Sequence, residues 1–337
     1  MRVSGLTLIT VIAEHSHHQA MSIAPYIKEI GRGKEGARSL SSEQAEDLMG
    51  QVLDGRVSDL EVGAFAMAMR IKGESTDELL GFLRAVHQRC LPISPDRPAV
   101  ILPSYNGARK LPNLTALLAL LVAQDGTPVL VHGPACDPGR VTTASVFHDL
   151  GLPVARDAED VLHGWARREP VFMPTATLCP PLARLLDVRW VVGLRNPGHT
   201  VAKLLDPTVG ARALRVVNHT HPEYGAALTA FLQRSGASAM LLRGTEGEPV
   251  ADPRRSPRLD VFLRGELRAD LSVPAQEGVL TELPVLPRSI DAATTALYIQ
   301  SVVSGEKPAP GPLTQQVDSL HRAVRALAEV ALHELSA

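Results

Sequence analysis

Residues 22–89 show a helical alternation of apolar and polar positions. Four apolar residues recur at helical spacing in one short segment, namely Val62, Phe65, Ala66 and Met69. Three serines stand three residues before a glutamine or glutamate, which is the capping-box spacing of a helix N-terminus: Ser41, Ser58 and Ser75. Gly55 and Gly73 stand where helices are expected to end. The pattern predicts a small bundle of helices with a buried apolar face.

Residues 102–151 show a different pattern, in which apolar runs alternate with turns. An apolar strand end is followed by Asn106 and Gly107, a long apolar helix, a buried strand at residues 128–131, and a second helix. This order is typical of an α/β unit that holds ligands at the carboxyl ends of parallel strands. Further apolar runs are predicted as strands of the same sheet, at residues 171–173, 190–192, 214–217 and 240–242.

The rest of the chain completes the predicted α/β fold class. Residues 259–263 and 267–271 alternate as antiparallel strands do, and closing helices are expected over residues 290–304 and 313–335. The proline-rich residues 91–98 read as a linker. We therefore predict a small helical domain over residues 21–92 and a large α/β domain with a mostly parallel sheet over residues 97–337. Residues 1–20 match neither pattern. They are expected to be a disordered extension, or a segment included because the start codon was assigned too early.

Composition limits the function classes. Hydrophobic residues make up 45% of the 337, as in ordinary globular proteins. The net charge is −2, so any binding of nucleic acid has to rest on a local basic patch. The three cysteines form no metal-ligand motif, and the longest apolar stretch is far too short to cross a membrane. The expected location is the cytoplasm, without a membrane partner.

The Asn106–Gly107 turn is the first candidate site. Asn-Gly favours a turn with positive φ, and a helix that starts just after it offers free N–H groups to an anion. The same pattern also fits an ordinary strand-to-helix turn that binds nothing.

Three motifs in this region give the chain a resemblance to the anthranilate phosphoribosyltransferase family. That family has a glycine-rich turn (GTGGD), an Asn-x-Ser-Thr helix start and a KHGN loop. Here the turn reads SYNGAR from Ser104, the helix start reads Asn-Leu-Thr from Asn113, and the loop reads Val-His-Gly-Pro from Val131. The chain most resembles the YbiB-like branch of this glycosyltransferase family 3 superfamily, whose members keep the fold and bind nucleic acid.

The resemblance implies a fold, a dimer and a residual phosphate pocket. The fold is that of nucleoside phosphorylases and phosphoribosyltransferases. Its small helical domain, here completed by helices within residues 182–205, forms a homodimer interface. The pocket would comprise Ser104, Asn106, Gly107, Asn113, Thr115, His132, Gly133 and Arg140.

Several departures from the family pattern predict that anthranilate phosphoribosyl transfer is lost. Tyr105 and Ala108 replace glycines where the backbone has to approach phosphate, and Val131 and Pro134 replace the lysine and asparagine of KHGN. The two family serines fall on Pro138 and Gly139, while Arg140 keeps a cation. The family's acidic metal-binding pattern is reduced to Glu246 and Glu248, for which a solvated turn is the alternative. No catalytic residue and no metal ligand is assigned, and no cofactor is expected.

Basic residues are concentrated in the segment 184–215, which holds six of them against two acidic ones. Arg195, His199 and Lys203 are four residues apart and would share one face of a helix. The candidate nucleic-acid contacts are Arg195, His199, Lys203, Arg212, Arg109, Lys110, Arg254 and Arg255. Scattered surface arginines are the alternative. Apart from Tyr105 and Trp190, few aromatic residues lie nearby, so backbone electrostatics should outweigh base stacking.

Three functions remain open from the sequence. The first is a homodimer that binds single-stranded DNA or RNA without sequence specificity. The second is a phosphoribosyltransferase with an altered substrate, which would use magnesium and phosphoribosyl diphosphate. The third is a purely structural partner protein.

Overall fold

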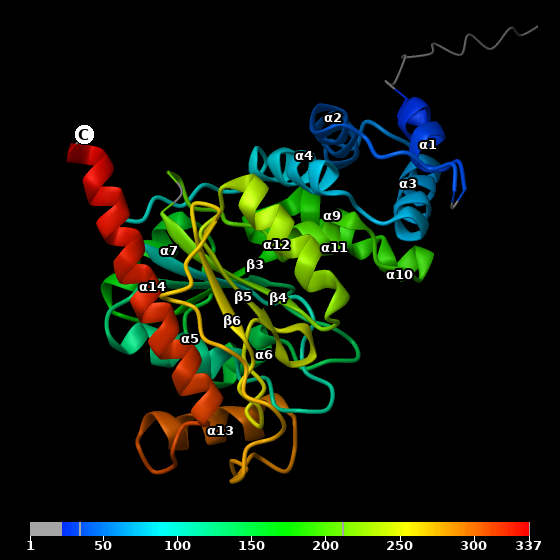
Figure 1. The fold of residues 1–337 in the computed structure, drawn as a ribbon. Coiled ribbons are helices and arrows are strands. Elements are labelled where there is room, and N and C mark those ends of the chain that lie inside the picture. The colour runs from blue at the N-terminus through cyan, green and yellow to red at the C-terminus, as the bar shows by residue number, and fades with distance from the viewer. Residues whose placement is uncertain (1–21, 34, 211, 337) are drawn as a thin grey trace, which may run out of the picture.

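The computed structural model describes residues 22–33, 35–210 and 212–336 (Figure 1). Four helices open this part of the chain: α1 (Ala24–Ile30), α2 (Ser42–Leu53), α3 (Asp59–Lys72) and α4 (Thr76–His87). The three predicted capping boxes are confirmed, because Ser41, Ser58 and Ser75 each accept from the backbone N–H three residues on. Phe65 and Met69 of α3 are fully buried, as the spacing predicts.

A seven-stranded sheet follows, in the order β3-β2-β1-β4-β5-β6-β7. Its strands are β1 (Ala99–Pro103), β2 (Val129–Gly133), β3 (Val171–Pro174), β4 (Ala213–His219), β5 (Ala239–Arg243), β6 (Leu259–Leu263) and β7 (Glu266–Leu267). The strands from β3 to β5 are parallel, and β6 and β7 are antiparallel. The predicted α/β class with a mostly parallel sheet is confirmed.

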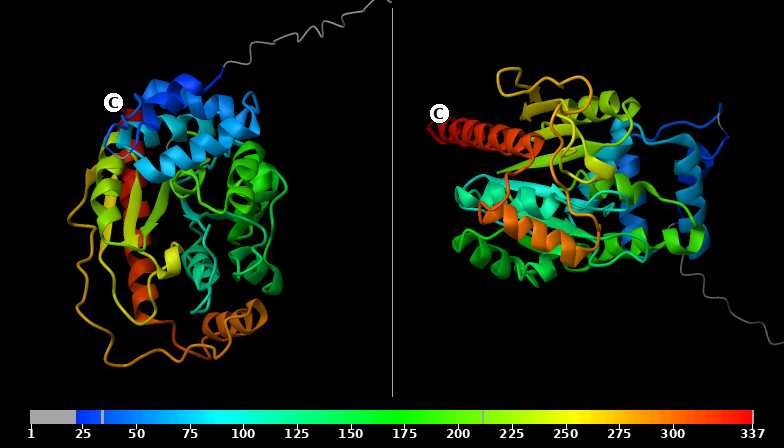
Figure 2. Two further views of the ribbon diagram at one scale, coloured as in Figure 1. Left: turned by 90° about the vertical axis from the view of Figure 1, so that its right-hand side faces the viewer. Right: turned by 90° about the horizontal axis from the view of Figure 1, so that it is seen from below.

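Helices cover both faces of the sheet (Figure 2). One face packs on α5 (Thr115–Gln124), α6 (Thr143–Asp149), α13 (Ala292–Val303) and α14 (Gly311–Ser336). The other packs on α7 (Ala158–Ala166), α8 (Thr175–Leu178) and α12 (Glu223–Ser235). Successive residues of β1 serve opposite cores, with Val100 in the first and Ile101 in the second.

The helical bundle shares the second core. Leu48, Phe65 and Phe82 of the bundle lie in one apolar cluster with the sheet residue Ile101. Two later helices, α9 (Pro180–Asp187) and α11 (Pro197–Ala202), contact α2, α3 and α4. The division at residues 21–92 and 97–337 stays a prediction, and the predicted extension 1–20 lies outside the described residues.

Two strand predictions were wrong. Residues 190–192 belong to the short helix α10 (Arg189–Val192), and Trp190 and Val191 are 56% and 89% exposed instead of lying inside the sheet. An apolar run of three residues does not by itself distinguish a strand from an exposed turn of helix. The strand predicted over residues 267–271 is reduced to β7, because the chain turns at Arg268, whose carbonyl accepts from Leu271 N.

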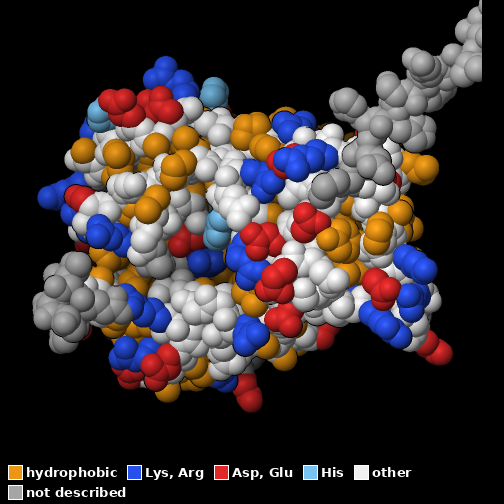
Figure 3. Space-filling model, turned by 90° about the horizontal axis from the view of Figure 1, so that it is seen from above, with side chains coloured by type: hydrophobic (Ala, Val, Ile, Leu, Met, Phe, Trp, Pro, Cys, Tyr) orange, Lys and Arg blue, Asp and Glu red, His pale blue; other side chains and the backbone are white. Residues whose placement is uncertain are grey.

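Charges are mixed on the face that includes the helical bundle. Figure 3 shows Lys and Arg side chains interspersed with Asp and Glu across it, with hydrophobic side chains at both ends of the face. No single-sign field spans this face, in keeping with the net charge of −2. Among the residues that the structure describes, no helix is long and apolar enough to cross a membrane.

Candidate functional site

The backbone N–H groups of the turn after β1 form an anion-binding site, which is occupied by a carboxylate of the same chain. Gly107 has φ +68°, as the Asn-Gly pattern predicts. The backbone N–H groups of Asn106 and Gly107 both donate to Oε1 of Glu248, each at 2.7 Å. Two adjacent N–H groups aimed at one oxygen are the geometry of backbone phosphate sites.

The second oxygen of Glu248 is held by hydroxyl groups. Ser104 Oγ donates to Oε2, and Thr115 Oγ1 lies 3.4 Å from the same atom. Glu248 is only 2% exposed. A buried carboxylate is tolerated when such donors surround it. The alternative of a solvated turn was therefore wrong for Glu248.

The carboxylate of Glu246 occupies a second anion-binding site on the same turn. Its Oε2 accepts from the backbone N–H groups of Arg109, Lys110 and Leu111, at 2.9, 3.0 and 3.2 Å. Partial burial works against ionisation, but these three donors outweigh it and hold the pKa of Glu246 below its ordinary value. The two acidic residues thus bind the backbone of the turn after β1.

A lysine clamps the loop that carries both carboxylates. Lys203 Nζ donates to the carbonyl of Gly247 at 3.1 Å. Burial lowers the pKa of Lys203 to about 8, although Glu248 nearby raises it. Lys203 follows α11 directly and faces this loop, so the prediction that it presents a cation on an open helix face was wrong.

Tyr105 does not block the turn, contrary to expectation. Its side chain is buried in the core, and its hydroxyl lies 2.9 Å from Nδ1 of His132. His132 Nε2 lies 3.3 Å from the carbonyl oxygen of Leu205. Both rings therefore point behind the turn, and neither His132 nor Tyr105 faces the carboxylates. The buried Tyr105 also offers no surface for stacking on a base.

Of the other predicted pocket residues, Asn113 and Gly133 make structural contacts, whereas Arg140 lies at the surface. Asn113 Nδ2 donates to Thr143 Oγ1 at 3.0 Å and so ties the start of α5 to that of α6. Gly133 lies against the carbonyl of Ser104, where a Cβ would collide, so it serves the packing of the strand ends. Arg140 reaches the surface beside the turn.

Arg140 belongs to a hollow of about 530 Å³, which we call the arginine hollow. Its four arginines are Arg109, Arg140, Arg189 and Arg195. Asp137 is its one acidic residue and pairs with Arg189 at 2.6 Å. The side chains of the other three arginines make no hydrogen bond or salt bridge with any described residue. Four arginines against one aspartate give the lining a net positive charge. Burial and the neighbouring Arg140 and Arg189 lower the pKa of Arg195.

His199 does not join this surface. It is 7% exposed and caps α11, where its Nδ1 lies 3.3 Å from the backbone N of Asn196. Burial, followed by Arg195 and Arg189, lowers the pKa of His199 to about 3, so the ring is neutral. The predicted basic face of Arg195, His199 and Lys203 was wrong, because α11 starts after Arg195 and ends before Lys203. His199 is buried, and Lys203 points to the carbonyl of Gly247.

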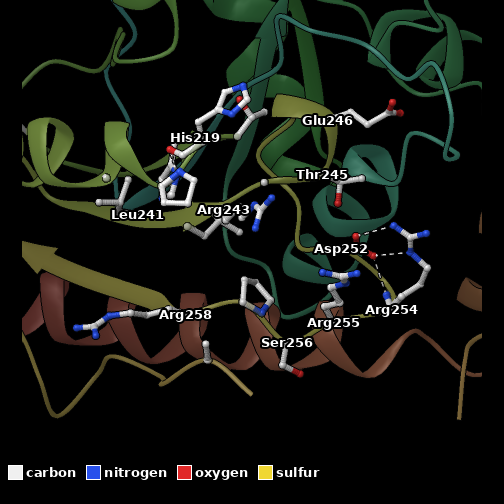
Figure 4. Close-up of a pocket in the computed structure, with 18 of the residues that line it drawn as sticks. His219, Leu241, Arg243, Thr245, Glu246, Asp252, Arg254, Arg255, Ser256 and Arg258 are labelled. Carbon is white, nitrogen blue, oxygen red and sulfur yellow. Dashed lines mark hydrogen bonds and ion pairs between the residues drawn. The ribbon is translucent and has the colours of Figure 1, made fainter. Parts of the chain in front are cut away.

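A second basic hollow lies beyond the loop of Glu246 (Figure 4). This basic groove encloses about 1090 Å³ and is lined by five cations, Lys110, Arg243, Arg254, Arg255 and Arg258, with His219 and His221. Arg254 is bound to Asp252 through two hydrogen bonds of 2.9 Å, and Arg258 to Asp260 at 2.7 Å. The side chains of Arg243 and Arg255 make no such bond with a described residue. Sequence reasoning missed Arg243, an isolated arginine at a strand end.

The two hollows meet at adjacent residues. Arg109 lines the arginine hollow and Lys110 lines the basic groove, while Glu246 fixes the backbone of both. Arg212 lies elsewhere, since it precedes β4 at the amino ends of the strands. The structure therefore brings together Arg195, Arg109 and Lys110, with Arg254 and Arg255 beyond them, and leaves Arg212 out.

Metal-binding residues do not assemble on this surface. The described residues contain no cluster of three or more His, Cys, Asp or Glu side chains that could hold a metal ion. Glu248 and one oxygen of Glu246 are taken by N–H and hydroxyl donors, and Pro249 and Val250 follow them. These residues do not fit a magnesium–diphosphate group in the arrangement seen here.

Comparisons with known proteins agree with this architecture. Residues 24–90 match the family model "Glycosyl transferase family, helical bundle domain". The chain is 40% identical to the Escherichia coli (strain K12) protein YbiB over 300 residues, 88% of this chain and 92% of that protein. It is 26% identical to the anthranilate phosphoribosyltransferase of Novosphingobium aromaticivorans over 79% of this chain and 81% of that enzyme.

Solved structures give the same fold. The anthranilate phosphoribosyltransferase of Thermus thermophilus superposes with a TM-score of 0.65 at 22% identity, covering 90% of this chain and 89% of that one. The Saccharomyces cerevisiae enzyme in complex with PRPP and Mg gives a TM-score of 0.58 at 12% identity, with 91% and 97% coverage. The chain belongs to the YbiB-like branch of the anthranilate phosphoribosyltransferase superfamily, glycosyltransferase family 3.

Proposed function

We propose that this protein is a homodimer that binds single-stranded DNA or RNA through the sugar–phosphate backbone, without sequence specificity, in the cytoplasm. The observation that carries the proposal is the arginine hollow, which is lined by three arginine side chains without a hydrogen-bonded partner among the described residues. Such a concentration of uncompensated charge favours a polyanion.

The shape of the surface favours an extended polyanion over a small one. The arginine hollow and the basic groove meet at Arg109 and Lys110, so a strand could pass from one to the other. Trp190 is half exposed beside the hollow, with the Arg189 guanidinium 4.1 Å from its ring centre. One exposed aromatic ring supports modest stacking on a base, while most of the binding free energy would come from phosphate contacts.

Removal of two hollow arginines tests this surface. We expect Arg140→Ala combined with Arg195→Ala to weaken binding of a labelled single-stranded oligonucleotide about tenfold at low salt, because two phosphate contacts are lost. The matched control, Arg184→Ala with Arg212→Ala, removes the same charge from exposed positions outside both hollows. Equal weakening by both double variants would show that only overall charge matters and would contradict the proposed site.

Anthranilate phosphoribosyl transfer is proposed to be lost. The proline and valine replacements in the KHGN-like loop and the absence of a described metal cluster support this view. Thermal stabilisation of the wild-type protein by phosphoribosyl diphosphate with magnesium would instead favour the alternative, a transferase with an altered substrate. A protein that responds to neither ligand nor oligonucleotide would be a structural partner.

An exposed apolar face on α3 supports a homodimer. Leu60 is 83% exposed, Met67 39% and Ile71 64%, and their spacing places them along one side of α3. Val191 of the neighbouring α10 is 89% exposed (Figures 1 and 2). Apolar residues clustered in this way mark an interaction surface.

Aspartate on this face should separate the subunits. We expect the wild-type protein to sediment as a dimer and Leu60→Asp with Ile71→Asp to sediment as a monomer, because a charge would be buried without a partner. Leu297→Asp, at an equally exposed position on α13, is the control and should leave the dimer intact. A dimer unaffected by the α3 changes would place the interface elsewhere.

A further inference from the structure

Two of the three cysteines lie together where the helical bundle joins the sheet. Cys90 follows α4, and Cys179 stands between α8 and α9. The backbone N–H of Leu91 donates to the carbonyl oxygen of Leu178 at 2.8 Å, so the two segments run side by side at this point. The thiols of Cys90 and Cys179 form a hydrogen bond with each other. Two residues far apart in the sequence are thus held close enough for a covalent bond.

The two cysteines differ in exposure. Cys179 is fully buried, and its Sγ lies 3.9 Å from the carbonyl oxygen of Val86 on α4. Cys90 is partly exposed and lines a hollow of about 340 Å³ together with His87 and Arg215. A small oxidant can therefore reach Cys90 from this hollow, whereas Cys179 is shielded from solvent.

The surroundings of the pair favour the loss of one proton. The hydrogen bond from the Cys90 thiol lowers the pKa of Cys179. Burial opposes this shift, but the guanidinium groups of Arg89 and Arg184 add to it. The same hydrogen bond, followed by burial, raises the pKa of Cys90. The pair therefore releases its first proton more readily than an isolated thiol does, and it holds the second.

We propose that Cys90 and Cys179 are a modification site, at which a peroxide converts the two thiols into a disulfide. Transfer of the shared proton to Cys179 leaves a thiolate at Cys90, which is the nucleophilic form of the side chain. The Cys90 Sγ attacks one oxygen of hydrogen peroxide and breaks the O–O bond. The products are a sulfenic acid on Cys90 and a hydroxide ion, which takes up the proton that the pair released and becomes water.

The second thiol completes the reaction. Cys179 Sγ attacks Cys90 Sγ, the S–S bond forms, and the sulfenic hydroxyl leaves with the Cys179 proton as a second water molecule. The two thiols are oxidised by two electrons in total, and the peroxide is reduced to two water molecules.

The disulfide would connect the end of α4 to the start of α9. A cross-link between residues 90 and 179 closes a long loop, so it lowers the entropy of the unfolded chain and should stabilise the folded protein. Neither cysteine lines the arginine hollow or the basic groove, so the inference is independent of nucleic-acid binding.

Peptide mass spectrometry after treatment with hydrogen peroxide tests the site in the full-length protein. The Cys136→Ser variant lacks the third cysteine, which is exposed, and is used to prevent cross-links between molecules. We expect a peptide pair joined between Cys90 and Cys179 and lighter than the reduced pair by two hydrogen atoms. The midpoint of thermal unfolding should rise by about 5 °C on oxidation. Dithiothreitol should reverse both changes.

Variants of the pair, made in the same Cys136→Ser protein, assign the two roles. Cys179→Ala should leave Cys90 as a sulfenic acid that dimedone labels, because the second thiol is missing. Cys90→Ser should leave Cys179 unlabelled, because this side chain is buried. Circular dichroism identifies the variants that are folded.

The Cys136→Ser protein decides the outcome even if a variant of the pair does not fold, because it retains both cysteines. Two free thiols in the folded protein after peroxide treatment would overturn the proposal. Oxidation of Cys90 to a sulfinic acid without a cross-link would also overturn it. A lower unfolding midpoint after oxidation would have the same meaning, because the bond would then distort the fold.

Discussion

At the scale of single residues, burial determines which histidines carry charge. His132 is fully buried and His199 nearly so. Burial is the largest cause that lowers the pKa of His132 to about 4 and that of His199 to about 3. Both rings are therefore neutral near pH 7, and neither contributes to a basic surface.

The same two histidines should make stability depend on pH. The unfolded chain takes up protons below about pH 6.5, whereas the folded rings stay neutral down to about pH 4, so folding is progressively weakened as pH falls between these values. Each ring should cost about 2 kcal/mol of stability at about pH 5. Above about pH 6.5 each ring is neutral in both the folded and the unfolded protein, so this loss of stability is absent.

Urea unfolding at about pH 7.5 and pH 5 measures this effect. His199→Gln keeps a side chain that can cap α11 but cannot titrate. We expect this variant to lose about 2 kcal/mol less than the wild-type protein between the two pH values. An unchanged pH dependence would show that His199 is not neutral in the folded state.

The sequence alone predicted the anion-binding turn but not the carboxylate that occupies it. Gly107 and its neighbours could be recognised because turn chemistry is local. Glu248 lies 142 positions from Asn106, and no local pattern tells which carboxylate will reach a given turn. The direction of Tyr105 was missed for the same reason, since its partner His132 belongs to another strand.

At the scale of elements, a buried ion pair connects two helices of the bundle. Glu78 of α4 is fully buried and binds Lys72 Nζ of α3 at 2.6 Å. It also accepts from the backbone N–H of Ser75 at 2.8 Å and that of Leu40 at 3.0 Å. The capping glutamate of α4 thus ties together α3, α4 and the segment before α2.

Loss of the cation should be far more costly here than at the surface. We expect Lys72→Met to lower the free energy of unfolding by about 3 kcal/mol, because a buried carboxylate loses its counter-charge. Arg84→Met breaks the 2.6 Å pair with Glu46, which is partly exposed, and should cost less than about 1 kcal/mol. Urea denaturation measures both, and equal losses would contradict the assigned importance of burial.

Helix starts and most strands could be predicted, whereas exposed apolar segments could not. The capping boxes depend on residues three apart, and the sheet strands are short runs buried on both faces. Residues 190–192 carry the same kind of apolar run but lie outside the sheet. Their exposure depends on how the elements pack in three dimensions, and the periodicity of the sequence does not predict that packing.

At the scale of the whole molecule, charge is distributed unevenly. The chain has a net charge of −2, and the face in Figure 3 mixes both signs. Arginine side chains without hydrogen-bonded partners among the described residues line the two hollows. The hollows meet at Arg109 and Lys110, which follow β1. A homodimer would present this surface twice, which would lengthen the track available to a strand.

The salt dependence of wild-type binding to a labelled single-stranded oligonucleotide tests the central claim most directly. A strand that neutralises about four cations of this surface should lose roughly 50-fold in affinity between about 50 and 200 mM salt. That result would support phosphate contacts as the source of binding. No binding at low salt, or an affinity that salt does not change, would contradict a nucleic-acid function for these hollows.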